Sequence, residues 1–224
     1  MEEVAATTMT TMTTAATKTP SIAVAAAAVA AAAAAAAAAL GAKEAGIEMA
    51  RAPAAQIVVV AAAKPRRRAA EAVARGIILA IPDTSPRQGT PGEDESALLG
   101  TGASYYVNAT EEPWSTHYQM FDYITKELPS VVEERVLGGL HPGARFSGKR
   151  SVMGHSMGGH GAIIASLKCP GTFLSCSAFA PVGNPSAVSE GPAFKAFTAY
   201  LGPPEENQAA WESYDASCLI QAYD

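Results

Sequence analysis

The chain has 224 residues, of which 49% belong to the hydrophobic set and 17% are charged. With 19 glycines and three cysteines, the composition excludes a collagen-like chain and a disulfide scaffold. The formal net charge of −5 argues against a strongly basic surface, so we expect no nucleic-acid partner. The length is compatible with one large domain or two small ones.

Residues 1–53 form a Thr- and Ala-rich segment of low complexity, which we interpret as a tail or a marginal helix. The uncharged stretch 22–40 is long enough to span a membrane. Alanine dominates it, however, and offers little surface to drive partition into lipid, so we expect no membrane partner. Glu2 and Glu3 precede a single Lys18, which does not match the positive leader of a secretory signal. A targeting segment and a membrane anchor are the alternatives.

Residues 54–224 alternate short apolar runs with segments of helical spacing. The pattern predicts strands at 57–60, 77–81, 151–153 and 173–180, and helices at 69–74, 115–128, 161–167 and 193–200. Pro129 is the expected breaker of the second helix. Strands that alternate with helices imply right-handed crossovers and a mostly parallel sheet covered on both faces, so the fold class is α/β.

One motif carries chemistry. Gly154-His155-Ser156-Met157-Gly158 is a G-x-S-x-G sequence between a short apolar run and a helical stretch, and Gly159 follows it. This context is typical of a nucleophile elbow, which holds its serine exposed above the carboxyl ends of the strands. We therefore predict Ser156 as the catalytic nucleophile and the backbone N–H of Met157 as an oxyanion donor. The alternative is a structural turn whose serine caps a helix.

Residues 151–162, SVMGHSMGGHGA, resemble the elbow of S-formylglutathione hydrolases, the esterase D family of α/β-hydrolases. The resemblance covers roughly residues 70–224 in register. It includes the stretches 82–87, 92–96, 100–103, 118–123, 177–181, 184–185, 199–202 and 211–216.

The resemblance implies an α/β-hydrolase fold and a serine thioesterase that hydrolyses S-formylglutathione to formate and glutathione, the last step of glutathione-dependent formaldehyde removal. It also implies a carboxylesterase activity on small esters. The substrate is thus a small molecule, and no metal or organic cofactor is implied. The three cysteines, Cys169, Cys176 and Cys218, lack metal-binding spacing, and their odd number suggests free thiols in the cytoplasm. A homodimer is left open.

The resemblance is incomplete. The family orders its triad Ser, Asp, His along the chain, but no histidine follows His160, and Asp215 matches a family aspartate on a helical stretch rather than the triad acid. The triad Asp and His are therefore not found in the chain, and we interpret 54–224 as a partial α/β-hydrolase domain that is truncated at its C-terminus. Residues 61–68 also replace a Leu-Ser-Gly-Leu-Thr-Cys stretch that gives the family a second oxyanion amide, and 188–190 replace Cys-Pro-Trp.

Because loss of a triad histidine lowers kcat by about 10⁶, we expect little or no activity. The alternatives are a catalytically dead fragment, or non-catalytic binding remnant, and a carboxylesterase with another base. His155 and His160 flank Ser156, but we expect both to pack or to support the site rather than act as the base. The acidic run 93–95 is expected to be a solvated turn rather than a cation site.

Overall fold

The computed structural model describes residues 55–61, 75–93, 95, 99–137 and 146–223, and everything below refers to these ranges. The low-complexity segment 1–53, its alanine-rich stretch and the expected helix at 69–74 lie outside them. Across the described ranges, no helix has both the length and the apolar character needed to cross a membrane.

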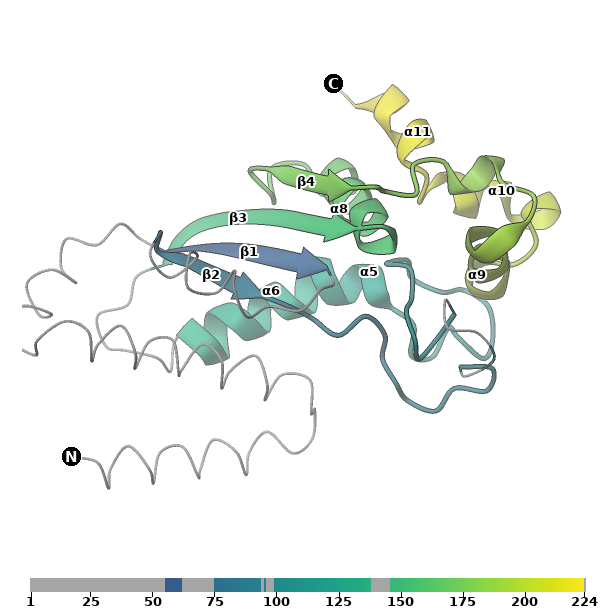
Figure 1. The fold of residues 1–224 in the computed structure, drawn as a ribbon, viewed down its shortest axis with the longest axis horizontal. Helices are drawn as coiled ribbons and strands as arrows, with labels where there is room; N and C mark the ends of the chain where they lie inside the picture. Colours follow the sequence, from purple (N-terminus) through teal and green to yellow (C-terminus); the bar gives the residue numbers. More distant parts are fainter. Residues whose placement is uncertain (1–54, 62–74, 94, 96–98, 138–145, 224) are drawn as a thin grey trace, which may run out of the picture.

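The described strands form one parallel sheet in the order β2-β1-β3-β4 (Figure 1). Strand β1 spans Ala55–Ala61, β2 Ile77–Ala80, β3 Phe146–His155 and β4 Cys176–Phe179. All three neighbouring pairs are parallel, which confirms the predicted mostly parallel sheet. Their carboxyl ends therefore meet at one edge of the sheet.

The strand bounds differ from the prediction where burial and pairing depend on partners far away in the sequence. Strand β3 begins at Phe146 rather than at residue 151, because Arg150 already pairs with Ile57 of β1. Strand β4 is shorter than the predicted 173–180, and Leu174 before it is 64% exposed. Strand β2 lies at an edge of the described sheet, and its residues 77–79 are only half-buried.

A continuous helical run precedes β3. It consists of α5 (Met120–Asp122), the π-helical η1 (Tyr123–Glu127), α6 (Leu128–Val131) and the π-helical η2 (Val132–Leu137). The prediction that Pro129 breaks this helix is wrong. The wider π turn ends in a bond from the Leu128 amide to the Tyr123 carbonyl, and Pro129 follows in the first turn of α6, where a missing N–H is tolerated.

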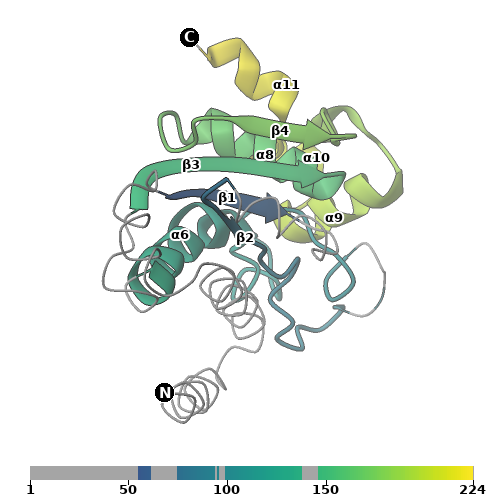
Figure 2. The same ribbon diagram turned by 60° about the vertical axis from the view of Figure 1, so that its left-hand side comes forward.

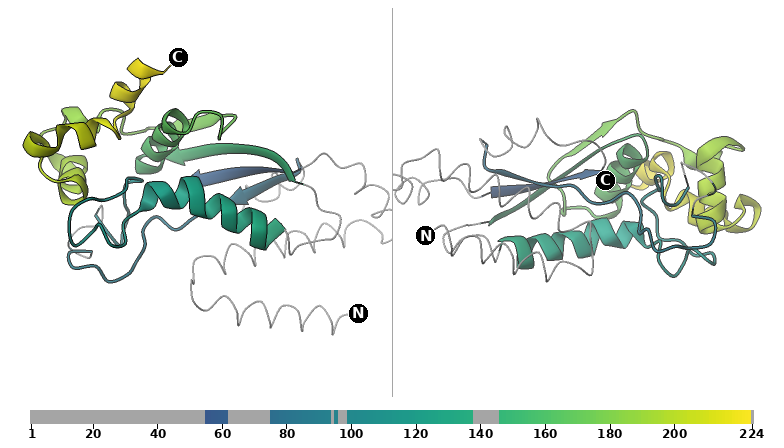
Figure 3. Two further views of the ribbon diagram at one scale, coloured as in Figure 1. Left: turned by 180° about the vertical axis from the view of Figure 1, so that it is seen from behind. Right: turned by 60° about the horizontal axis from the view of Figure 1, so that its bottom comes forward.

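Helix α8 (Met157–Lys168) follows β3 directly and covers the same face of the sheet as the run from α5 to η2 (Figures 1 and 3). Leu128 and Val132 from that run share one buried cluster with Ala162 of α8. Ala80 of β2 and Val152 of β3 complete the cluster from the sheet. The sheet thus supports α8 from one side along its length.

The chain after β4 is largely helical and packs at the carboxyl end of the sheet (Figure 2). It contains α9 (Gly191–Leu201), α10 (Pro204–Glu212) and α11 (Ala216–Leu219), with short 3₁₀ turns η3 (Pro185–Ala187) and η4 (Ile220–Ala222). The predicted helix 193–200 corresponds to α9, which is capped at its C-terminus by Gly202 with φ +81°. Helix α10 escaped prediction because Trp211 is its only buried residue.

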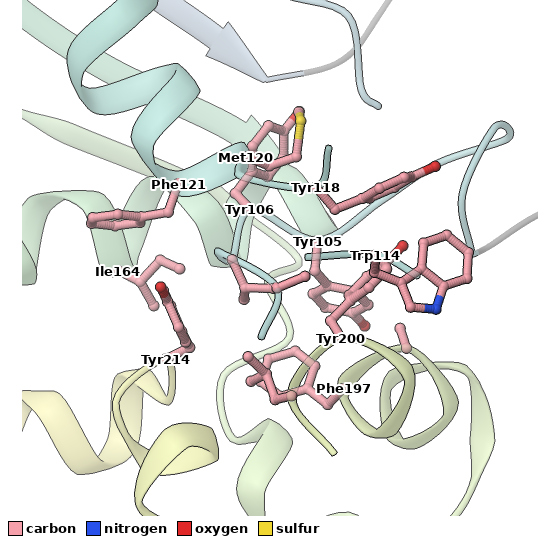
Figure 4. Close-up of a cluster of buried hydrophobic side chains, with 14 of the residues drawn as sticks. Tyr105, Tyr106, Trp114, Tyr118, Met120, Phe121, Ile164, Phe197, Tyr200 and Tyr214 are labelled. Carbon is pink, nitrogen blue, oxygen red and sulfur yellow. The ribbon is translucent and has the colours of Figure 1, made fainter. Parts of the chain in front are cut away.

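An aromatic core joins these helices to the loop that precedes α5 (Figure 4). The rings of Tyr118 and Tyr200 stack with centroids 5.4 Å apart, and Trp114 meets both edge-on at 4.8 and 5.2 Å. Phe197 meets Trp211 at 5.2 Å. Such aromatic pairs contribute about 0.5–1.5 kcal/mol each beyond their burial, so this cluster fixes α9 against the loop.

Glu93 anchors the loop between β2 and the aromatic core. Its side chain is buried, at 4% exposed, and accepts hydrogen bonds from the amides of Gln88, Gly89 and Thr90 at 3.2, 2.7 and 3.0 Å. The Tyr118 hydroxyl donates a further bond at 2.5 Å. The expectation of a solvated turn is therefore wrong for Glu93, because a buried carboxylate with four donors is a structural group.

Replacement of Glu93 by alanine should lower the free energy of unfolding by about 2–4 kcal/mol, because buried amides and a phenol lose their acceptor. Glu95→Ala is the matched control, since Glu95 is exposed, and it should change stability by less than about 0.5 kcal/mol. Urea unfolding followed by circular dichroism measures both variants. Equal losses for the two would contradict the anchoring role.

Stability should also depend on pH through Glu93. Burial alone would raise the pKa of this carboxyl, but hydrogen bonds from Tyr118 and the backbone amides lower it below the ordinary value of 4.5. A lowered folded-state pKa stabilises the protein above the unfolded-state value, and this contribution disappears as the pH falls through the folded-state pKa. Glu93→Gln should therefore lose less stability than the wild type between pH 6 and about pH 3, as measured by urea unfolding across that range.

Candidate active site

Ser156 is the single residue between strand β3, which ends at His155, and helix α8, which begins at Met157. Its backbone has φ +56° and ψ −118°, a conformation that L-residues seldom adopt. The predicted strand–turn–helix context is therefore present. The alternative of a simple helix cap is wrong, because the Ser156 side chain makes no capping hydrogen bond to α8.

Glycines let the turn close. A Cβ atom on Gly154 would lie 2.1 Å from the carbonyl oxygen of Gly158, so no side chain fits at residue 154. One on Gly159 would lie 3.1 Å from the Phe179 carbonyl oxygen, and one on Gly161 would lie 2.5 Å from the Tyr106 ring. The glycines predicted for the elbow thus have separate functions: Gly154 lets the turn close against the Gly158 backbone, and Gly159 lets α8 approach the end of β4.

The end of β4 holds the turn in place. The Ser156 amide donates to the Phe179 carbonyl at 2.9 Å, and Ala180, the next residue, has φ +44°. The Ser156 amide is therefore occupied, whereas Met157 lies in the first turn of α8, whose amides have no acceptor within the helix. Its N–H is the available donor, and the positive end of the helix dipole adds to its attraction for an anion.

The neighbouring strands bring two further segments to Ser156. Ala61, the last residue of β1, pairs with Gly154, and His155 pairs with Phe179. The chain that leaves β1 therefore starts beside the elbow, although residues 62–68 lie outside the described ranges. The site occupies the carboxyl edge of the parallel sheet, where open α/β sheets bind their ligands.

The two histidines of the motif have different surroundings. His155 is exposed, whereas His160 is fully buried, and its Nε2 lies 2.7 Å from the Tyr214 carbonyl oxygen. Burial lowers the pKa of His160 to about 4, although the Tyr214 carbonyl and the Asp215 carboxylate act in the opposite direction. Among the described residues, no histidine or carboxylate makes a hydrogen bond with the Ser156 hydroxyl.

Asp215 is fully buried and acts within the fold. One carboxylate oxygen accepts from the Ser186 amide and hydroxyl at 2.8 and 2.7 Å, and the other from the amides of Ser217 and Cys218 at 2.7 and 3.2 Å. These bonds cap α11 and fix the loop after β4. They agree with the prediction that Asp215 is not the triad acid.

The described cysteines, Cys169, Cys176 and Cys218, are free thiols. Within the described ranges, no group of three or more His, Cys, Asp and Glu side chains is placed to hold a metal ion.

The parallel sheet and the strand–turn–helix at Ser156 are those of the α/β-hydrolase fold, and the comparisons agree. The model of the Esterase family matches residues 63–224, so the chain belongs to this family. It is 48% identical to mouse S-formylglutathione hydrolase over 152 residues and 47% identical to the rat enzyme over 152 residues. These alignments cover 66% of this chain and 49% of each relative, so the chain spans about half the length of the curated relatives it matches.

Comparisons with solved structures agree with the sequence comparisons. An S-formylglutathione hydrolase from Agrobacterium tumefaciens matches with a TM-score of 0.62 and 38% identity, over 76% of this chain and 60% of that chain. MPT51 from Mycobacterium tuberculosis matches with a TM-score of 0.50 and 20% identity, over 74% of this chain and 58% of that chain, which concerns the fold alone. The resemblance to S-formylglutathione hydrolases and the α/β-hydrolase fold predicted from the sequence are confirmed.

Gly154→Ala should destabilise the protein by about 3 kcal/mol or more, because the new methyl group would overlap the backbone of Gly158. Gly183→Ala is the control, since a Cβ at residue 183 meets nothing within 4 Å, and it should change stability by less than about 0.5 kcal/mol. Thermal and urea unfolding test the pair. Wild-type stability of Gly154→Ala would show that the turn is not as tight as described.

Proposed function

We propose that the chain is a serine thioesterase for S-formylglutathione, with Ser156 as the nucleophile. The observation that carries the proposal is the backbone of Ser156, with φ +56° between β3 and the first turn of α8. The 48% identity to mouse S-formylglutathione hydrolase supports the substrate. Small carboxylic esters are the second substrate class that such a site accommodates.

The reaction would proceed through an acyl-enzyme. The Ser156 oxygen attacks the formyl carbonyl while its proton passes to a base, and the carbonyl oxygen takes up negative charge that the Met157 N–H stabilises. The carbon–sulfur bond then breaks, and glutathione leaves as the thiol once its thiolate regains a proton. Water attacks the formyl ester and releases formate, which restores the serine hydroxyl.

No general base for Ser156 is placed among the described residues. Within the described residues, His160 binds the Tyr214 carbonyl and Asp215 caps α11, so neither is placed to act on Ser156. A site with the nucleophile and one oxyanion donor but no base retains only about 10³–10⁴ of acceleration over water. We therefore propose that residues 1–224 by themselves turn over slowly, with a catalytically dead or binding remnant as the second candidate.

The same proposal extends to the substrate class, the cellular compartment, the domain division and the oligomeric state. The substrate is a small molecule, and the three free thiols support a reducing compartment such as the cytoplasm. We keep the division into a tail, 1–53, and a partial α/β-hydrolase domain, 54–224, and the homodimer, as predictions. Size-exclusion chromatography with light scattering tests the last of these.

The proposal predicts that Ser156→Ala abolishes both thioesterase activity and covalent labelling. The purified chain, incubated with p-nitrophenyl acetate, should gain one acetyl group on the peptide that carries Ser156, detected by mass spectrometry. Release of glutathione from S-formylglutathione should be at least about 10²-fold slower than for the mouse enzyme, because no histidine or carboxylate among the described residues is bonded to the Ser156 hydroxyl. Ser130→Ala, at an exposed helical position, is the matched control and should behave as the wild type.

Turnover within tenfold of the mouse enzyme would contradict the slow-turnover part and show that a base is present. Acetylation at a residue other than Ser156, or activity that survives Ser156→Ala, would contradict the nucleophile. Hydrolysis of p-nitrophenyl acetate without any hydrolysis of S-formylglutathione would favour the carboxylesterase alternative.

A further inference from the structure

His160 closes the first turn of the helix that carries the elbow. Its amide donates to the Ser156 carbonyl at 3.0 Å, so the residue is bonded directly to the proposed nucleophile through the backbone. The residue is 0% exposed, and its ring packs edge-on against both Tyr105 and Phe197, with ring centroids 5.5 and 5.8 Å away. In such apolar surroundings an aliphatic side chain would pack without polar requirements, whereas an imidazole requires a hydrogen-bond partner.

The contacts of the ring define its protonation. Nε2 lies 2.7 Å from the Tyr214 carbonyl oxygen, which can only accept, so Nε2 carries the hydrogen. Nδ1 is buried and, among the described residues, has no hydrogen-bond partner. A second hydrogen on Nδ1 would be a buried donor without an acceptor, which costs free energy, so the neutral Nε2–H form fits this site.

The hydrogen bond from His160 Nε2 to the Tyr214 carbonyl completes a set of contacts that surrounds the elbow. The Ser156 amide is bonded to the Phe179 carbonyl at the end of β4, and the loop after β4 is bonded through Ser186 to Asp215. Asp215 follows Tyr214, whose carbonyl accepts from His160. The turn is therefore held from β4 on one side and from the segment before α11 on the other.

We propose that His160 is a positioning residue of the elbow, whose Nε2–H, bonded to the Tyr214 carbonyl, holds the first turn of α8 in the conformation that presents Ser156. The inference rests on the proposed role of Ser156 as nucleophile. It assigns to His160 neither proton transfer nor contact with substrate. Its consequence is local: loss of the Nε2 donor loosens the Ser156 amide while the sheet behind it stays intact.

Nuclear magnetic resonance of the full chain tests this without turnover. With ¹⁵N-labelled histidine, the His160 signals, identified by their loss in His160→Gln, should show Nε2 protonated and Nδ1 unprotonated from pH 6 to pH 7.5. Hydrogen exchange of the Ser156 amide should accelerate by about tenfold or more in His160→Leu, which keeps bulk but loses the donor. In His160→Gln, whose amide nitrogen can replace the donor, exchange should stay within about threefold of the wild type.

Two references separate positioning from general destabilisation. The Val152 amide of β3, bonded to the carbonyl of Ser175 just before β4, should exchange at the same rate in all variants, and His117→Gln, at an exposed loop residue, should leave the Ser156 amide unchanged. A ring protonated on Nδ1, unchanged Ser156 exchange in His160→Leu, or equal acceleration at Val152 would each overturn the proposal.

If His160→Leu does not fold, two measurements still test the proposal: the tautomer of His160 in the wild type, and hydrogen exchange of the Ser156 amide in His160→Gln. Because none of these measurements uses substrate, failure of S-formylglutathione hydrolysis would count against the proposed function and not against the role of His160.

Discussion

The site depends on the backbone of Ser156 being held at φ +56°. A residue in such a conformation costs about 1–3 kcal/mol and persists only where its surroundings enforce it. Two contacts enforce it here: the approach of Gly158 to Gly154, which leaves no space for a side chain, and the bond from the Ser156 amide to the Phe179 carbonyl. The turn places Ser156 between the carboxyl end of β3 and the first turn of α8, where the Met157 amide has no acceptor within the helix.

The small residues of α8 let the helix that follows Ser156 pack closely against two neighbouring parts of the molecule. Gly159 faces the Phe179–Pro181 segment and Gly161 faces the Tyr106 ring, each at distances that exclude a Cβ without movement. Ala162 then packs with Val152 against the sheet. A side chain at residue 159 would push α8 away from the end of β4, whose Phe179 carbonyl accepts from the Ser156 amide. The glycine run is therefore a packing requirement of the helix as well as a requirement of the turn.

The sequence predicts this part of the molecule well because the elbow is local. The spacing of Gly154, Ser156 and Gly158, with apolar residues before and a helical pattern after, identifies the turn without reference to distant residues. Features that depend on distant partners were mispredicted or missed. Pro129 sits inside a helix because a π turn precedes it, and Glu93 is buried because Tyr118 and three backbone amides surround it. Neither environment is visible in the residues next to them.

The contacts that position Ser156, the proposed nucleophile, are distinct from any group that would take its proton. On the side of the elbow that faces the core, the His160 ring packs against Tyr105 and Phe197, and its Nε2 is bonded to the Tyr214 carbonyl. A group that takes the proton of Ser156 therefore has to approach from the open side, across the carboxyl ends of the strands, where Ser156 is partly exposed. The neutral Nε2–H form of His160 suits this arrangement, because a charged imidazole would bury a second donor at Nδ1, which has no hydrogen-bond acceptor among the described residues.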